Sequence, residues 1–170
     1  MDRYEQVKAA SDPSTPPNRL AELSKDSLFV RRAVAGNEST PPEVLARLAK
    51  DKNEDRLVRW IVANNVSTPP GILTFLAQDK SWQIRGGVGC NPSTPPETLA
   101  QLAHDEDEYV RYWVATNSST PPETLAQLVD DVNEDVCRSA KENPNTAIDL
   151  SKVSVSSTYN ISLTDTMGID

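Results

Sequence analysis

The sequence predicts an all-α solenoid of two-helix repeats, and the main reason is one tetrapeptide that recurs along the chain. Ser-Thr-Pro-Pro begins at Ser14, Ser39, Ser67, Ser93 and Ser119. The successive spacings of 25, 28, 26 and 26 residues mean that most of the chain is a single unit repeated. Such a period is typical of arrays in which each unit packs only against its neighbours. No strand pattern of comparable strength occurs in residues 1–150.

The first helix of each unit is expected to begin at the proline pair. Thr40 stands three residues before Glu43, which is the pattern of a capping box with Thr as the N-cap and the first Pro at N1. The same pattern occurs at Thr94 and Thr120. A Leu-x-x-Leu step follows in every unit and predicts the buried side of this helix: Leu20/Leu23, Leu45/Leu48, Leu73/Leu76, Leu99/Leu102 and Leu125/Leu128.

A second helix is predicted from the pattern Val-Arg-x-x-Val, whose apolar residues lie four apart on one face. The arginines are Arg31, Arg59, Arg85 and Arg111, with Cys137 in the fifth unit. An Asn three residues after the second apolar position suggests a helix stop in the left-handed conformation. These residues are Asn37, Asn65, Asn91, Asn117 and Asn143. Both helices are too short to be stable alone, so stacking must stabilise them.

Each unit also contains an Asp three residues beyond its second Leu, at Asp26, Asp51, Asp79, Asp105 and Asp131. Only the gap between this Asp and the Arg position varies in length, which identifies the gap as a surface turn between the two helices. Because Asp and Arg recur once per unit, we expect the two series to pair with each other or with helix-end carbonyls between layers.

The ends of the chain depart from the repeat. Residues 1–13 resemble the second half of a unit and are expected to cap the array, whose units start near 14, 39, 67, 93 and 119. A degenerate unit begins at 143 and completes the array of residues 1–150. The Ser/Thr-rich residues 151–170 are read as a disordered or loosely docked tail; the alternative is a short extended segment that covers the last core layer.

The repeat resembles the leucine-rich repeat variant family of bacterial proteins. The shared residues are the start from Asn91 to Ala103 and the finish from Val110 to Asn117. The resemblance implies α-helices alternating with shorter, often 3₁₀, helices in a right-handed superhelix without sheets. The better-known members also hold an iron–sulfur centre through a cysteine cluster outside the repeats. Nothing in this sequence matches that cluster, so no cofactor is expected.

Composition and motifs argue against several classes of function. There is no signal-peptide-like start and no apolar run of membrane-spanning length, so a cytoplasmic location is expected. Cys90 and Cys137 are two units apart and are expected to be free thiols. The single histidine, His104, occupies a position that varies freely between units, which is typical of a solvated helix end. With no nucleophile, phosphate-loop or metal-ligand motif, catalysis is not expected.

Charge is distributed unevenly along the chain, whose net charge is −8. Residues 1–66 carry 11 basic and 10 acidic side chains, whereas residues 67–170 carry 6 and 15. An acidic edge opposes every phosphate group, so nucleic-acid binding is not expected. The acidic turns suit a solvated face, or alternatively a basic partner surface.

Positions that vary between units are the ones to examine for recognition. One position of the second helix carries Trp60, Gly86 and Tyr112 in successive units, and we predict a notch with Gly86 as its floor and the two aromatic side chains as its walls. Arg59, Arg85 and Arg111 are placed alongside it. The next position carries Gly87 and Trp113; it is predicted to belong to the core, with Gly87 making room for Trp113.

These features predict a non-catalytic protein- or peptide-binding module, because aromatic and Arg side chains are the usual energetic centres of interfaces. The protein is expected to be a monomer. The alternative is a structural spacer or assembly unit that stacks through its own ends. The identity of the partner does not follow from the sequence.

Overall fold

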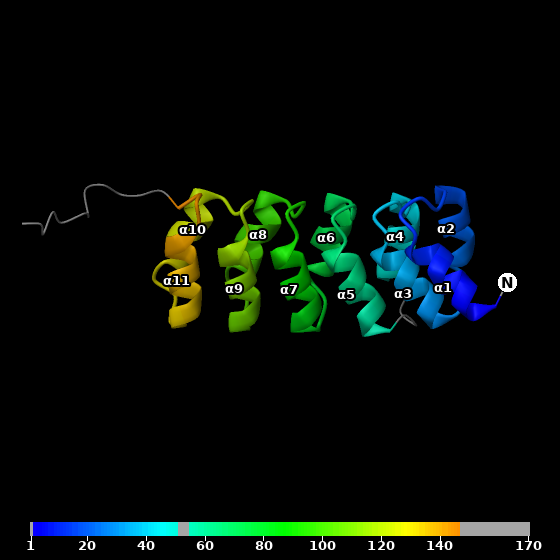
Figure 1. Cartoon of the computed structure of the whole chain (residues 1–170). Helices are drawn as coiled ribbons and strands as arrows, with labels where there is room; N and C mark the ends of the chain where they lie inside the picture. Colours follow the sequence, from blue (N-terminus) through cyan, green and yellow to red (C-terminus); the bar gives the residue numbers. More distant parts are fainter. Residues whose placement is uncertain (1, 51–54, 147–170) are drawn as a thin grey trace, which may run out of the picture.

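The computed structural model describes residues 2–50 and 55–146, which form α-helices and connecting turns with no strand in those ranges. The helices alternate between two rows along a single array (Figure 1). The odd-numbered helices are α1 (Arg3–Ser11), α3 (Leu28–Gly36), α5 (Arg56–Asn64), α7 (Trp82–Cys90), α9 (Glu108–Thr116) and α11 (Glu134–Glu142). The even-numbered helices are α2 (Pro17–Leu23), α4 (Pro42–Lys50), α6 (Pro70–Leu76), α8 (Pro96–Leu102) and α10 (Pro122–Leu128). The predicted all-α array of helix pairs is therefore confirmed.

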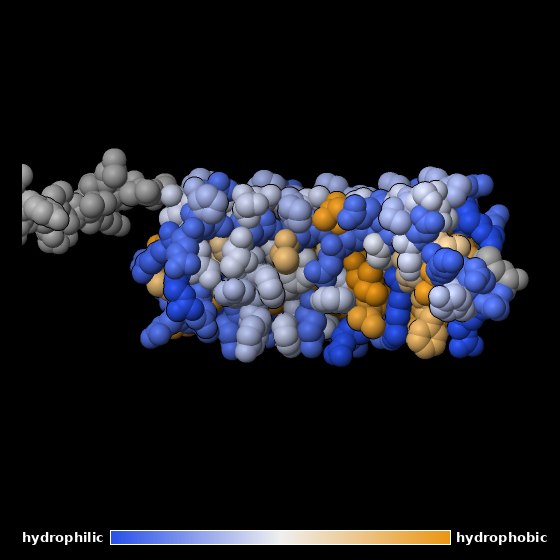
Figure 2. All heavy atoms as spheres, in the orientation of Figure 1, coloured by the Kyte–Doolittle hydropathy of each residue, from blue (hydrophilic) through white to orange (hydrophobic). Residues whose placement is uncertain are grey.

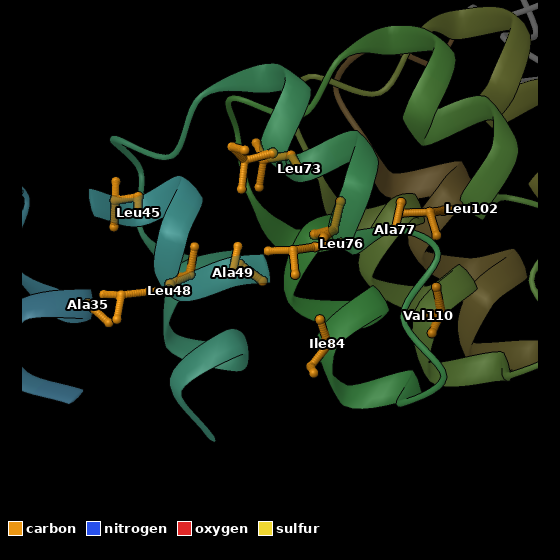
Figure 3. Packing of buried hydrophobic residues seen from close by; sticks show 14 of the residues in the cluster. Ala35, Leu45, Leu48, Ala49, Leu73, Leu76, Ala77, Ile84, Leu102 and Val110 are labelled. Atoms are coloured by element: carbon orange, nitrogen blue, oxygen red, sulfur yellow. The ribbon is translucent and has the colours of Figure 1, made fainter. Parts of the chain in front are cut away.

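The core runs the length of the array between the two rows. The predicted leucines of the even-numbered helices are buried, as are the apolar pairs of the odd-numbered helices. Figure 3 shows this packing, with Leu48 and Leu76 on the even-numbered row and Ile84 and Val110 on the odd-numbered row. Because each helix has only seven or nine residues, burial against neighbouring layers must supply its stability.

The predicted capping box is wrong. In the described caps of the even-numbered helices the N-cap is the first proline, which makes no side-chain cap bond, as Pro95 does before α8. The Thr94 hydroxyl instead donates to the carbonyl of Val88 at the end of α7, with an O–O distance of 2.6 Å. Thr40, Thr68 and Thr120 make the same contact with the helix before them. Each hydroxyl thus adds a second hydrogen bond to a helix-end carbonyl that also accepts the backbone N–H of the C-cap asparagine.

The predicted left-handed helix stop is also wrong. Asn91 has φ −73° and ψ 123°, and no described residue has a positive φ. Its side chain explains why Asn recurs: Nδ2 donates to the carbonyl oxygens of Ala63 (2.8 Å) and Asn65 (3.0 Å) in the preceding unit. Its Oδ1 accepts the backbone N–H of Ser93 at 2.9 Å. All three bonds recur at Asn37, Asn65, Asn117 and Asn143. This asparagine ladder joins successive units through buried, satisfied polar groups.

Residues 51–54 and 147–170 lie outside the described residues, and so do the predictions for the end of the degenerate unit and for the tail at 151–170.

Candidate partner-binding face

The repeated arginines form ion pairs within the array. Nε and Nη2 of Arg85 donate to the two carboxylate oxygens of Asp105 at 2.6 and 2.8 Å, and Nη1 donates to the carbonyl of Asp79 at 2.9 Å. Arg111 makes the same three contacts with Asp131 and with the carbonyl of Asp105. Arg59 bonds Asp79 at 2.8 Å. The expected pairing between layers is thus confirmed for these three.

These pairs are largely shielded from water, since the arginine side chains are 12–15% exposed and the aspartates 8–12%. The hydrogen bond from Arg111 lowers the pKa of the Asp131 carboxyl, and the bond to Asp105 raises the pKa of Arg85. Bidentate Arg–carboxylate bonds use the planar edge of the guanidinium. The side chains of Arg59, Arg85 and Arg111 therefore bond to neighbouring units of the array, and their role in binding a partner stays a prediction.

The predicted notch over Gly86 does not form. Gly86 is buried, and a Cβ built on it would lie 3.2 Å from Cδ1 of Trp113 on α9, the next odd-numbered helix. Gly89 also faces that helix, with its Cβ position 3.4 Å from Cβ of Trp113. The glycines of α7 therefore let the Trp113 side chain pack closely, and that ring occupies the space expected for a ligand.

The prediction for the neighbouring position is corrected as well. Gly87 faces α5, because a Cβ there would lie 2.6 Å from Nδ2 of Asn64 and 3.2 Å from Cβ of Ala63. Trp113 is 40% exposed, so it is not a core residue. Trp113 lies three residues after the core residue Val110, and this spacing places its side chain at the boundary between adjacent odd-numbered helices. That boundary is only partly covered.

Trp60 and Tyr112 lie in separate hollows. Trp60 is 41% exposed and lines a hollow of about 420 Å³ together with Leu57 and Gln83. Tyr112 is half-buried, packs edge-on against Trp113, and lines another hollow of about 370 Å³ between α9 and α11. The structure does not bring these two side chains together, and their part in binding stays a prediction.

A larger surface connects these hollows across the odd-numbered helices, and we call it the aromatic face. Arg32 lines both the Trp60 hollow and a further hollow between α1 and α3. Trp82, the neighbour of Gln83, stacks on Tyr109 with ring centroids 5.3 Å apart, and Tyr109 lines the hollow that contains Tyr112. The exposed apolar side chains of this face are Tyr4, Phe29, Leu57, Trp60, Trp82, Tyr109 and Trp113. Figure 2 shows apolar residues gathered over α3 and α5, with charged residues beside them.

Several members of this face were missed by the sequence reasoning. Phe29, Leu57, Trp82 and Tyr109 stand at the first two positions of the odd-numbered helices. Those positions vary between units as freely as the one that singled out Trp60, so the signal was present. They were overlooked because only positions after the first core valine of each helix were compared between units, and these residues lie before it.

Other kinds of site find no support in the described part of the chain. Within residues 2–50 and 55–146, no group of three His, Cys, Asp or Glu side chains could hold a metal ion. None of the described helices has the length and apolarity that spanning a membrane requires. Cys90 and Cys137 are free thiols, as expected, and burial raises the pKa of Cys90.

Two rows of short helices with an exposed aromatic face define a helical-repeat protein. Residues 5–56 match the model of the leucine-rich repeat variant domain, and residues 82–107 match that of the leucine-rich repeat variant. A solved structure described as a leucine-rich repeat variant with a novel repetitive structural motif is 29% identical, with a TM-score of 0.62. The match covers 84% of this chain and 56% of that protein, so this chain spans little more than half its length. No curated protein sequence matches the chain. The two model matches and the structural match together support the leucine-rich repeat variant family for these repeats.

Proposed function

We propose that the array is a non-catalytic module that binds a protein or a peptide along the aromatic face. The observation that carries the proposal is the continuity of that face from α1 to α11, through the shared wall at Arg32 and the Trp82–Tyr109 stack. Scattered apolar side chains are normal on a protein surface, whereas a contiguous series with polar neighbours is typical of interaction sites.

The residue types support the same proposal. Trp, Tyr and Arg are the residues on which interface binding energy concentrates. The rings of this face stand on helices fixed by the asparagine ladder and the buried Arg–Asp pairs. A partner would therefore meet a rigid surface, and little conformational entropy would be lost on binding.

The test is a selection from a displayed random-peptide library on the folded protein. Peptides that bind the wild type are then measured against a Trp60→Ala/Tyr112→Ala double variant and against Phe75→Ala. Phe75 is a matched control because it is an exposed aromatic residue on α6, in the other row. We expect binding to survive in the control and to be lost in the double variant. Peptides that bind the double variant equally well, or no enrichment at all, would refute binding at this face.

Assembly through the ends of the array is a second candidate, and the asparagine ladder is the observation that favours it. A second copy could continue the ladder, because every unit uses the same bonds. At α1, however, Asp12 stands in the ladder position: its Oδ1 accepts the N–H of Ser14 at 2.8 Å, but a carboxylate has no N–H to donate onward. Light scattering over a range of concentrations distinguishes the two candidates, since only end-stacking predicts a mass that increases with concentration.

A further inference from the structure

The end of the aromatic face over α1 and α3 combines an apolar hollow with a rim of arginines. The hollow has a volume of about 820 Å³ and is lined by Arg3, Tyr4, Val7, Phe29, Arg32 and Ala33. Phe29 is 55% exposed within it. A concave apolar surface of this kind suits a large apolar side chain of a partner.

Two guanidinium groups lie over the same ring in this hollow. The Cζ atoms of Arg3 and Arg32 are each 5.8 Å from the centroid of Phe29. Cation–π contacts of this kind hold the guanidinium plane but use none of its N–H donors. The donors of Arg3 therefore remain available to a carboxylate that approaches the hollow, whereas Arg32 already donates from Nη2 to Asp55.

The linings of the two hollows at this end contain three arginines, Arg3, Arg32 and Arg56, and one carboxylate, Asp55. Arg3 and Arg56 are exposed and form no ion pair with any residue in the described ranges. Arg32 bonds Asp55, and its buried Nε has no hydrogen-bond partner there. Asp55 is the only carboxylate in the lining of the two neighbouring hollows, and it already accepts the N–H of Leu57, which lowers its pKa.

The opposite end of the face has the reverse charge. The hollow between α9 and α11 is lined by Glu108 and Asp135 against one cation, Arg138, which already bonds Asp135. The chain as a whole carries a net charge of −8. An acidic partner is therefore attracted to the arginine-rich end and repelled by the acidic end, so that charge fixes which end of the face it uses.

We propose that the surface formed by Arg3, Tyr4, Phe29, Arg32, Arg56 and Trp60 is a docking site for an acidic peptide segment that presents a large apolar side chain. The apolar side chain occupies the hollow over Phe29. The flanking Asp or Glu carboxylates accept hydrogen bonds from Arg3 and Arg56 on either side. This site rests on the proposed function and adds to it the chemistry of the partner and the end of the face that the partner uses.

Three synthetic peptides test this site. They share a central Phe-Leu-Phe core and differ only in their flanking residues, which are Asp and Glu, Asn and Gln, or Lys and Arg. Isothermal titration calorimetry measures the dissociation constants, and heteronuclear NMR follows the indole N–H signals of the three tryptophans. We expect the acidic peptide to bind most tightly, to weaken as salt is added, and to shift the signal of Trp60 but not that of Trp113.

Matched variants locate the interaction. Arg3→Gln/Arg56→Gln removes two exposed guanidinium groups that form no ion pair in the described part of the chain, and only the exposed contact of Arg3 with Phe29 is lost, so the fold should be unchanged by circular dichroism. We expect it to weaken binding of the acidic peptide by about tenfold. Arg138→Gln is the control, because Arg138 occupies in α11 the position of Arg32 in α3 and also bonds an aspartate. It should leave the dissociation constant unchanged.

The possible failures are distinguishable. Tighter binding of the neutral or basic peptide, or an equal loss in Arg138→Gln, would overturn the acidic-partner site while leaving a peptide-binding function in place. Binding of none of the three would also overturn this site, and the library selection would then decide separately whether the face binds peptides at all.

Discussion

Replacing Asn91 by Ala should cost far more stability than a surface substitution normally does. Asn91 is 2% exposed, donates to the carbonyls of Ala63 and Asn65, and accepts the N–H of Ser93. The Asn65 carbonyl keeps its bond from the N–H of Thr68, whereas the buried Ala63 carbonyl receives no other bond from the described residues.

The expected magnitude follows from these partners. A buried carbonyl left without a donor costs about 1–3 kcal/mol, and each further lost bond costs about 0.5–1.5 kcal/mol, less where water replaces the partner. Ser93 is exposed, so water can reach its N–H. We therefore expect Asn91→Ala to lower the free energy of unfolding by about 2–4 kcal/mol, a large share of the stability of a typical domain.

Urea unfolding followed by far-ultraviolet circular dichroism measures this change. Asn64→Ala is the matched control, because Asn64 is exposed and donates only to the Trp60 carbonyl within its own helix, at 2.8 Å. The control should stay within about 0.5 kcal/mol of the wild type. If Asn91→Ala unfolds at the same urea concentration as the wild type and the control, the asparagine ladder does not hold the units together.

Three further predictions concern other parts of the array. Gly71→Ala should raise the free energy of unfolding by about 0.5–1 kcal/mol in the same assay, because its Cβ would meet nothing within 4 Å; a decrease would contradict the open space assigned there. Gly86→Val should displace the ring of Trp113, lowering the free energy of unfolding by about 1–3 kcal/mol and changing tryptophan fluorescence; an unchanged spectrum would argue against that packing. The bond from Arg111 lowers the pKa of Asp131, so this carboxylate stabilises the fold above the ordinary carboxyl pKa and loses that effect as pH falls below about 4. Stability should therefore depend less steeply on acid pH in Asp131→Asn, and an identical pH profile would refute the coupling.

The recurrence of residue types predicted the elements, but not how the polar residues are used. Thr94 fits a capping box by spacing, yet its hydroxyl bonds the preceding helix. Asn91 fits a left-handed stop, yet it has an extended backbone and bonds the preceding unit. In both cases a local motif competed with a buried carbonyl in the neighbouring unit. A bond to a buried group that water cannot reach is worth more than one to an exposed helix start.

The candidate site was predictable only in part. The rule that variable positions point to recognition led to Trp60 and Tyr112, and both contribute to hollows on the surface. It could not exclude Gly86, because the ring that covers this residue comes from Trp113, one unit further along the chain. Nor could it place Arg3 over Phe29, because this contact joins α1 to α3 and depends on how closely the two helices pack.

The sequence by itself determined the repeat, the two helices of each unit and the buried leucines and valines, and it indicated that the Arg and Asp series bond within the array. These follow from periodicity, because every unit must present the same groups to its neighbour at the same interval. Only the tertiary structure decided which side chains share a surface. The aromatic face is made by residues about one repeat apart, and their contacts depend on how closely adjacent helices approach: where α7 carries glycines, α9 packs a tryptophan against it, and where α1 meets α3, a hollow with an arginine rim remains.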